Sequence, residues 1–231
     1  MKALLFVFLI GGCQSIEKPA DSIRSQAIAN GRDSTLSQGI GLLQQGRPDQ
    51  ALPILERSVA EAPRSEEAHN YYGVALVKTG NLHDAIAEFR KSLALRPHYA
   101  DALLNLGATL NLVGDHAGAV NNLEAALAAR PIYQEAETEL GSALAQSGNV
   151  EGAILAFREA IRQRPTMFKA HHELGLLYRQ IGDNAGALAQ FRQAVAADPN
   201  SPNAHIRDGA TITLQIRCNG VVPPRQRVAV F

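Results

Sequence analysis

The sequence predicts an all-α protein, built as a solenoid of five helical hairpins. The first observation behind this prediction is a set of glycines, alanines and prolines that recur every 34 residues along much of the 231-residue chain. Self-similarity at a fixed period of this size is typical of stacked supersecondary units. The second observation is that hydrophobic residues between these landmarks follow helical spacing, and no long alternating strand pattern interrupts the repeats. The third is a hydrophobic content of 46% without tryptophan, which favours a sizeable core of closely packed small residues.

Each landmark has a physical role in a pair of antiparallel helices. A glycine in a left-handed conformation ends the first helix, because it carries no Cβ that would clash. A proline ends the second helix, because it lacks an N–H and fixes φ. A further glycine and an alanine allow close approach where the two helices cross. We call each set of equivalent positions, one per repeat, a column. The glycines at the helix crossing are Gly39, Gly73, Gly107, Gly141 and Gly175, and those that end the first helix are Gly46, Gly80, Gly114, Gly148 and Gly182. The alanine column is Ala51, Ala85, Ala119, Ala153 and Ala187, and the proline column is Pro63, Pro97, Pro131, Pro165 and Pro199.

Three more columns complete the hairpin. The position after the second glycine begins the second helix, and most of its occupants are short polar or acidic residues suited to an N-cap: Arg47, Asn81, Asp115, Asn149 and Asp183. The inward positions of both helices are hydrophobic, and we expect them to form the core. They are Leu42, Leu76, Leu110, Leu144 and Tyr178 on the first helix, and Leu55, Phe89, Leu123, Phe157 and Phe191 on the second.

This pattern resembles the tetratricopeptide repeat (TPR) family, whose helix-turn-helix unit has the same length. The resemblance covers residues 32–201, as repeats 32–65, 66–99, 100–133, 134–167 and 168–201. It departs from the family at the usual early aromatic, where Thr35, His69, Leu103, Glu137 and His171 stand, and the first repeat has Gln38 where the others place Tyr or Leu. The resemblance implies a right-handed α-α superhelix, with a concave groove that the first helix of each repeat lines and that binds proteins or peptides.

Candidate groove residues are the positions of the first helices that the family pattern leaves exposed. Asn105 and Asn111 are the strongest candidates, because an amide can bond both polar groups of a peptide backbone; the alternative is that both are merely solvated. The groove set is Asn70, Lys78, Asp101, Asn105, Asn111, Ser142, Gln146, Lys169, His172 and Arg179, beside the apolar Val74, Val77, Leu104, Ala108, Leu112 and Leu176. Lys169 and Arg179 would give the groove a small basic end in the last repeat.

Relatives that bind chaperone tails clamp a terminal carboxylate with Lys, Asn and Arg side chains. At those places this chain has Leu36, Ile40, Tyr71, Asp101 and Asn105. The comparison of residues therefore disfavours a cytosolic chaperone adaptor.

Composition and motifs argue against catalysis and against nucleic acid. Lys plus Arg and Asp plus Glu number 22 each, so no global field would attract a polyanion. His171-His172-Glu173 lacks the second histidine of a helical zinc site, since the position four beyond His172 is Leu176. His69 and His171 occupy an inward place, which favours packing. We predict no enzyme, cofactor, metal, small-molecule substrate or nucleic-acid partner.

The N-terminus resembles a lipoprotein signal. Lys2 precedes an apolar run, Ala3 to Ile10, that is too short to span a bilayer. Leu9-Ile10-Gly11-Gly12-Cys13 resembles the lipobox of bacterial lipoproteins, which implies a signal peptide over residues 1–12 and a lipid anchor on Cys13. The alternatives are a secretion signal cut elsewhere, or a cytoplasmic protein with an apolar start. Residues 13–31 are expected to form the lipidated cysteine and a polar linker. Gln14 stands where, by the usual sorting rule of lipoproteins, an aspartate would retain the protein in the inner membrane, so the resemblance implies the outer membrane, facing the periplasm.

The carboxyl end breaks the period. Pro202 to Ile212 begins like a sixth first helix, so residues 202–231 are expected to form a partial capping helix and an irregular tail. Thr211 to Arg217 alternates in strand fashion, and Cys218 would be unpaired if Cys13 carries lipid.

The combined features suggest a scaffold. Lipobox plus repeats resemble TPR lipoproteins of pilus and secretion-system assembly, the tight-adherence (TadD-like) and type IV pilotin groups. The expected function is thus a membrane-anchored scaffold for protein–protein interaction. An adaptor for cell-wall hydrolases or proteases, and a regulatory subunit of a glycosyl-transferring enzyme, are the alternatives.

Overall fold

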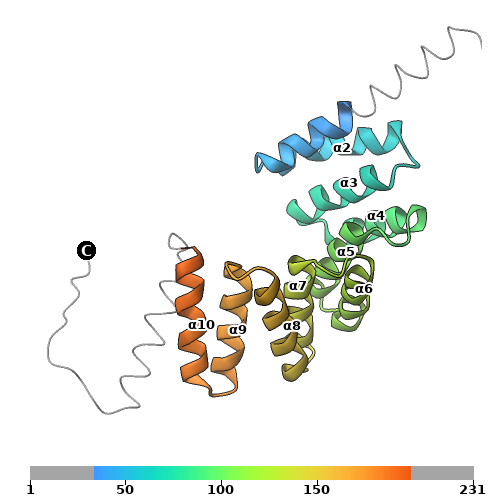
Figure 1. The fold of residues 1–231 in the computed structure, drawn as a ribbon. Helices are drawn as coiled ribbons and strands as arrows, with labels where there is room; N and C mark the ends of the chain where they lie inside the picture. The colour runs from blue at the N-terminus through green and yellow to red at the C-terminus, as the bar shows by residue number, and fades with distance from the viewer. Residues whose placement is uncertain (1–33, 199–231) are drawn as a thin grey trace, which may run out of the picture.

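The structure, a computed structural model, describes residues 34–198, and this part of the chain is helical throughout (Figure 1). The described chain begins within a helix that ends at residue 44. The helices that follow are α2 (Pro48–Glu61), α3 (Glu66–Lys78), α4 (Leu82–Leu95), α5 (Ala100–Leu112), α6 (His116–Ala129), α7 (Gln134–Gln146), α8 (Val150–Gln163), α9 (Phe168–Gln180) and α10 (Asn184–Ala197). The predicted all-α class and the alternation of two helices per repeat are confirmed.

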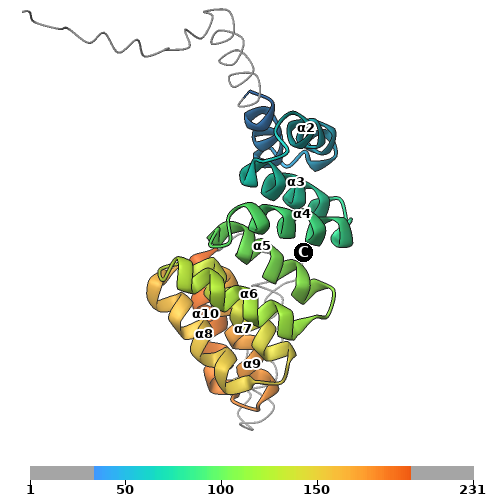
Figure 2. The ribbon, with the colours of Figure 1, turned by 90° about the vertical axis from the view of Figure 1, so that its right-hand side faces the viewer.

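The helices stack as hairpins into a curved α-α superhelix. Each first helix packs against its own second helix, as α3 does on α4 and α5 on α6. First helices of successive repeats also contact one another, so α3, α5, α7 and α9 form a continuous layer. Figure 1 shows one bent stack that runs from α2 at the top to α10 at the left, and Figure 2 shows the same stack from the side. We call the layer of first helices the inner layer and α4, α6 and α8 the outer helices. The contacts among first helices agree with the predicted lining of the concave face by this layer.

The second glycine of each repeat ends the first helix as predicted. Gly114, just beyond α5, has a φ of 88°, a left-handed conformation that strains any residue with a Cβ. The chain then closes back on the helix, because the N–H of Asp115 donates to the carbonyl of Leu110 at 2.9 Å. Glycines 46, 80, 148 and 182 also have positive φ.

The first glycine of each repeat makes room for the core residue of the second helix. A Cβ built on Gly73 would lie 2.6 Å from the ring of Phe89, which is fully buried. Gly141 and Phe157 meet in the same way at 2.7 Å. The large side chain therefore fills the space that the missing Cβ leaves, which is why glycine and a bulky residue recur together.

The N-caps follow the sequence prediction only in part. The side chains of Asp115, Asn149 and Asp183 each accept a hydrogen bond from the backbone N–H three residues later, at 2.8 to 3.0 Å. That third residue is a glycine in all three repeats. Asn81 makes no such cap, because its amide donates to Thr79 Oγ1 at 3.0 Å instead.

Several predictions concern residues outside the described range of 34–198. These are the signal peptide, Cys13 and its lipid, the linker, the capping helix and tail of residues 202–231, and Cys218. Within the described range, no helix is both long and apolar enough to cross a membrane.

Candidate protein-binding groove

Two hollows follow one another along the inner layer of first helices. The α3–α5 hollow has a volume of about 210 Å³ and is lined by Val74, Val77, Lys78, Phe89, Asn105, Ala108, Thr109 and Leu112. The α5–α9 hollow has a volume of about 370 Å³, and its lining includes Asn111, Leu112, Glu139, Ser142, Gln146, Lys169, Glu173 and Leu176. Leu112 lines both hollows, so they adjoin each other, and we call the two together the groove.

The predicted groove residues divide into two classes. Lys78, Asn105, Asn111, Ser142, Gln146 and Lys169 line the groove, together with the predicted apolar residues except Leu104, which packs against the core. Asn70, Asp101, His172 and Arg179 lie outside the lining of both hollows. The burial and the partners of individual side chains explain the difference.

Asn70 is buried, so its predicted exposure is wrong. Its side chain lies between α3 and α5, and only 2% of the residue is exposed. The amide of Asn105 donates to Asn70 Oδ1 at 2.9 Å. The pair therefore ties two successive first helices together at the wall of the α3–α5 hollow, and Asn105 is half-buried rather than simply solvated.

Asn111 is also more buried than predicted, with 8% exposure. Its Oδ1 accepts a hydrogen bond from His116 Nδ1 at 2.7 Å, which links the end of α5 to the start of α6. Asn111 still borders the α5–α9 hollow, but one side of its amide is already occupied by His116.

Lys169 does not give the groove a basic end. Its Nζ forms an ion pair with Glu139 Oε1 from the preceding repeat, so its charge is neutralised within the α5–α9 hollow. Arg179 is half-buried on α9 and does not join it. The predicted basic end is therefore wrong.

His172 belongs to the packing between α9 and α10. Its ring stacks on Phe168 with centroids 5.5 Å apart, and it meets Phe191 at 6.0 Å. Only 12% of the side chain is exposed. This histidine holds the last described hairpin together instead of facing the groove.

Asp101 stabilises a repeat boundary. Its Oδ1 accepts hydrogen bonds from Tyr133 Oη at 2.7 Å and from Arg130 Nη1 at 2.9 Å, and the Arg130 guanidinium lies over the Tyr133 ring at 4.3 Å. Burial and the hydrogen bond to Asp101 raise the pKa of the Tyr133 phenol. Because Asp101 already accepts both donors, it is not a free carboxylate for a partner.

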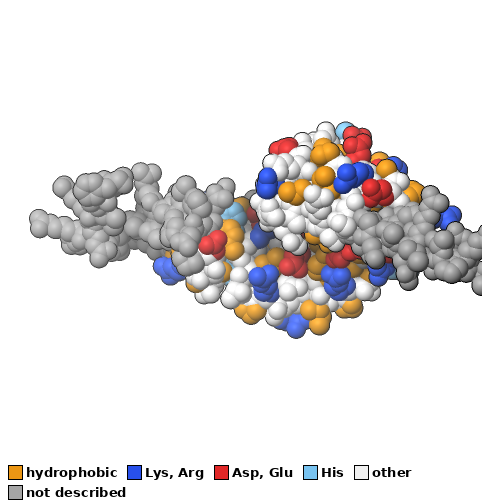
Figure 3. Space-filling view, turned by 90° about the horizontal axis from the view of Figure 1, so that it is seen from above, with side chains coloured by type: hydrophobic (Ala, Val, Ile, Leu, Met, Phe, Trp, Pro, Cys, Tyr) orange, Lys and Arg blue, Asp and Glu red, His pale blue; other side chains and the backbone are white. Residues whose placement is uncertain are grey.

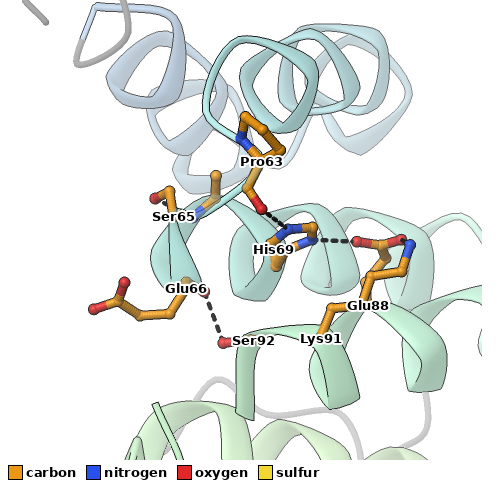
Figure 4. Close-up of polar contacts among 8 residues, drawn as sticks. Pro63, Ser65, Glu66, His69, Glu88, Lys91 and Ser92 are labelled. Atoms are coloured by element: carbon orange, nitrogen blue, oxygen red, sulfur yellow. Dashed lines mark hydrogen bonds and ion pairs between the residues drawn. The ribbon is translucent and has the colours of Figure 1, made fainter. Parts of the chain in front are cut away.

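Histidines that replace the family aromatic form a buried polar motif. His69 Nδ1 lies 2.6 Å from Glu88 Oε2 and its Nε2 lies 3.1 Å from the carbonyl of Pro63, while Lys91 pairs with Glu88 at 2.7 Å (Figure 4). A carbonyl oxygen can only accept, so Nε2 donates to Pro63, while Nδ1 shares a hydrogen bond with the Glu88 side chain. The ring thus ties α3 to α4 and to the segment before α3.

His171 repeats this motif without the charge. Its Nε2 lies 2.9 Å from the carbonyl of Pro165, and its Nδ1 lies 2.9 Å from the side chain of Gln190. The predicted packing role of both histidines is confirmed by their burial. Sequence reasoning missed the partners, although each histidine follows a proline by six residues and precedes Glu or Gln by nineteen.

Among the exposed residues of the groove, one aliphatic side chain and one cation without a carboxylate partner stand out. Leu112 is 66% exposed between the two hollows. Lys78 is exposed in the α3–α5 hollow, and within residues 34–198 no carboxylate forms an ion pair with it. On the face shown in Figure 3, acidic and basic side chains lie interspersed, so that face has no large region of one sign.

Comparisons with known proteins agree with this architecture. Similar solved structures include a thermophilic TPR protein, TTC0263, of Thermus thermophilus (23% identity, 79% of this chain and 99% of that chain, TM-score 0.69) and pilF of Pseudomonas aeruginosa (21% identity, 84% and 93%, TM-score 0.69). MamA from Desulfovibrio magneticus RS-1 is 26% identical over 74% of this chain and 97% of that chain, with a TM-score of 0.63. No curated protein matches the sequence.

Family models give the assignment. One, described as a tetratricopeptide repeat, matches residues 36–100, 73–112 and 113–168, and a second with the same description matches residues 144–207. Together these ranges span most of the chain, residues 36–207, and include the helical hairpins that the structure describes from α2 to α10. The chain belongs to the tetratricopeptide repeat family.

Proposed function

We propose that this TPR scaffold for protein–protein interaction is lipid-anchored at Cys13 to the bacterial cell envelope, on the outer membrane facing the periplasm. Several acyl chains on one cysteine would give firm retention, whereas one chain alone binds a bilayer only marginally. The scaffold would hold partner proteins in its groove during assembly of a pilus or secretion machine. The observation that carries the binding role is the pair of adjoining hollows along α3, α5, α7 and α9, with Leu112 between them.

A protein segment suits this groove better than a small molecule does. The two hollows are open, adjoin each other at Leu112 and are lined by several helices, which suits an extended chain that spans both. An exposed leucine at the junction offers apolar area that a partner can bury. The groove therefore supports binding without turnover.

The pilus or secretion role rests on the lipobox resemblance together with the repeats. The likeness to pilF agrees with it, although at 21% identity that likeness concerns the fold. Identifying the captured partner would separate this role from that of an adaptor for cell-wall enzymes.

Groove binding is tested by affinity capture from envelope extracts with a matched pair of variants. Leu112 and Leu155 are each 66% exposed, but Leu155 lies on the outer helix α8. We expect Leu112→Gln, which introduces the residue found at the same place in the next two repeats, to lose the captured partner. Leu155→Gln should retain it. Equal capture by both variants would contradict binding in the groove.

The anchor is tested by labelling cells with palmitate and fractionating membranes. The native chain and Cys218→Ala should carry label and sediment with membranes, whereas Cys13→Ala should do neither. Labelling that persists in Cys13→Ala, or that disappears in Cys218→Ala, would refute a lipid on Cys13.

A further inference from the structure

The two halves of the groove differ in chemical character. Polar and paired groups dominate the α5–α9 hollow, where Glu139 and Lys169 neutralise each other. The α3–α5 hollow has walls of Val74, Val77 and Ala108 and a single cation, Lys78. A partner segment therefore meets an apolar half with an uncompensated positive charge and a polar half without one.

The size of the α3–α5 hollow limits what can enter. Its volume of about 210 Å³ is below the range of about 300–1,000 Å³ that typifies sites for drug-sized ligands. One aliphatic or aromatic side chain fits this space, whereas an enclosed cofactor does not. The polar amide at its wall, Asn105, is already tied to Asn70, so the remaining selection is by shape and by charge.

Lys78 supplies the charge selection. It stands in the last turn of α3, where a cation also interacts favourably with the helix dipole. Its aliphatic stem can lie along the apolar wall while the ammonium group reaches the rim. Because no carboxylate within residues 34–198 pairs with it, a partner carboxylate would not have to displace an existing ion pair.

Leu112 supplies the apolar contact on the opposite wall. In the preceding and following repeats the same position holds Lys78, Gln146 and Gln180, all polar. The leucine is thus the exception in its column, and it is largely exposed. Together with the walls of Val74, Val77 and Ala108 it gives exposed apolar area rimmed by polar groups, which marks an interaction surface.

We propose that the α3–α5 hollow recognises an extended segment of a partner protein in which an apolar side chain stands beside an aspartate or glutamate. The apolar side chain enters between Val77 and Leu112, and the carboxylate pairs with Lys78. This inference rests on the proposed binding role of the groove and names the chemistry of the segment. Lys78 lies away from the places of the family's carboxylate clamp, so a free chain end is not required.

A charge-swap experiment tests the proposal. The full chain in detergent micelles is used to select binders from a random peptide library displayed on phage, in parallel with Lys78→Glu. The native chain should enrich peptides with an apolar residue next to an acidic one, and Lys78→Glu should shift the enrichment toward basic neighbours. Synthetic versions of the native binders should lose about threefold to tenfold in affinity for Lys78→Glu, as expected for an exposed ion pair turned repulsive.

The control is Arg90→Glu, which makes the same change of charge on the outer helix α4. It should enrich the same peptides as the native chain, and circular dichroism should show equal helix content in all three proteins. Peptides that bind Lys78→Glu as tightly as they bind the native chain would overturn this inference, but they would not contradict the proposed binding role of the groove. If the native chain enriches no peptide, both the inference and the groove role fail. Self-association that Leu112→Gln abolishes would also overturn it, since a second copy would then fill the hollow.

Discussion

Replacement of Gly73 by alanine tests the packing on which the superhelix depends. An added Cβ would lie 2.6, 2.8 and 2.9 Å from three ring carbons of Phe89. These distances are about 1 Å shorter than the optimum of roughly 3.5–4.0 Å between carbon atoms. Phe89 is fully buried, so its ring has no free space to enter. Overpacking of this kind costs about 1–3 kcal/mol.

A matched glycine isolates the cost of this clash. Gly41 also lies within a helix, but a Cβ there would meet nothing within 4 Å. Both changes gain about 1 kcal/mol of helix propensity, so Gly41→Ala should stabilise the fold and Gly73→Ala should not. The difference between their free energies of unfolding should be about 1–3 kcal/mol, the overpacking term alone.

The measurement is urea denaturation of both variants, with far-ultraviolet circular dichroism as the signal that monitors unfolding. Repeat arrays can lose cooperativity, so the slope of each transition is compared with that of the native chain. Equal stabilisation by Gly41→Ala and Gly73→Ala would refute the argument that the glycine column exists to admit the aromatic ring.

Further predictions concern the buried polar groups. Glu88→Gln should change the free energy of unfolding by less than about 1 kcal/mol, because an amide can still form a hydrogen bond with the His69 ring. Glu88→Ala should lower the free energy of unfolding by about 1–3 kcal/mol, because it leaves the ring nitrogen unpaired. Urea denaturation measures both changes. Asn70→Ala and Asn105→Ala, alone and combined, should show a coupling of about 0.5–1.5 kcal/mol in a double-mutant cycle, and additive effects would contradict the inter-repeat bond. Burial, and to a smaller extent the negative charges of the nearby Asp101 and Glu67, raise the pKa of the Tyr99 phenol to about 12. A raised pKa in the folded state means that folding favours the protonated phenol, so this stability is present below about pH 10 and is lost as pH rises toward 12. The ultraviolet titration of the native chain minus that of Tyr99→Phe should show a single phenol that ionises above pH 10, and a difference that appears near the ordinary value of about 10 would contradict the burial.

Much of the fold follows from local rules that leave a trace in every repeat. Gly114 must take a positive φ to end α5, and Gly73 must lack a Cβ to admit Phe89. Both needs are met by one residue type, so they appear in the sequence as unbroken columns. The direction of each helix and the layer that lines the groove follow from the same columns.

The site was less predictable, because burial at the edge of a helix depends on how repeats stack. Helical spacing places Asn70 on the groove side of α3, but only the angle of α5 decides that it is covered. Lys169 meets Glu139 from the preceding repeat, a pairing that no spacing within one repeat reveals. The histidine motif is different, since its proline and its Glu or Gln recur at fixed separations and could have been found.

Site-specific crosslinking tests the central claim most directly. A photoreactive amino acid is placed at Leu112 in the groove, and in a second protein at Leu155 on the outer face, where exposure is the same. After irradiation of intact cells, position 112 should give a discrete adduct with a partner protein, and position 155 should not. Adducts of the same pattern and yield at both positions, or at position 155 alone, would contradict binding through the groove.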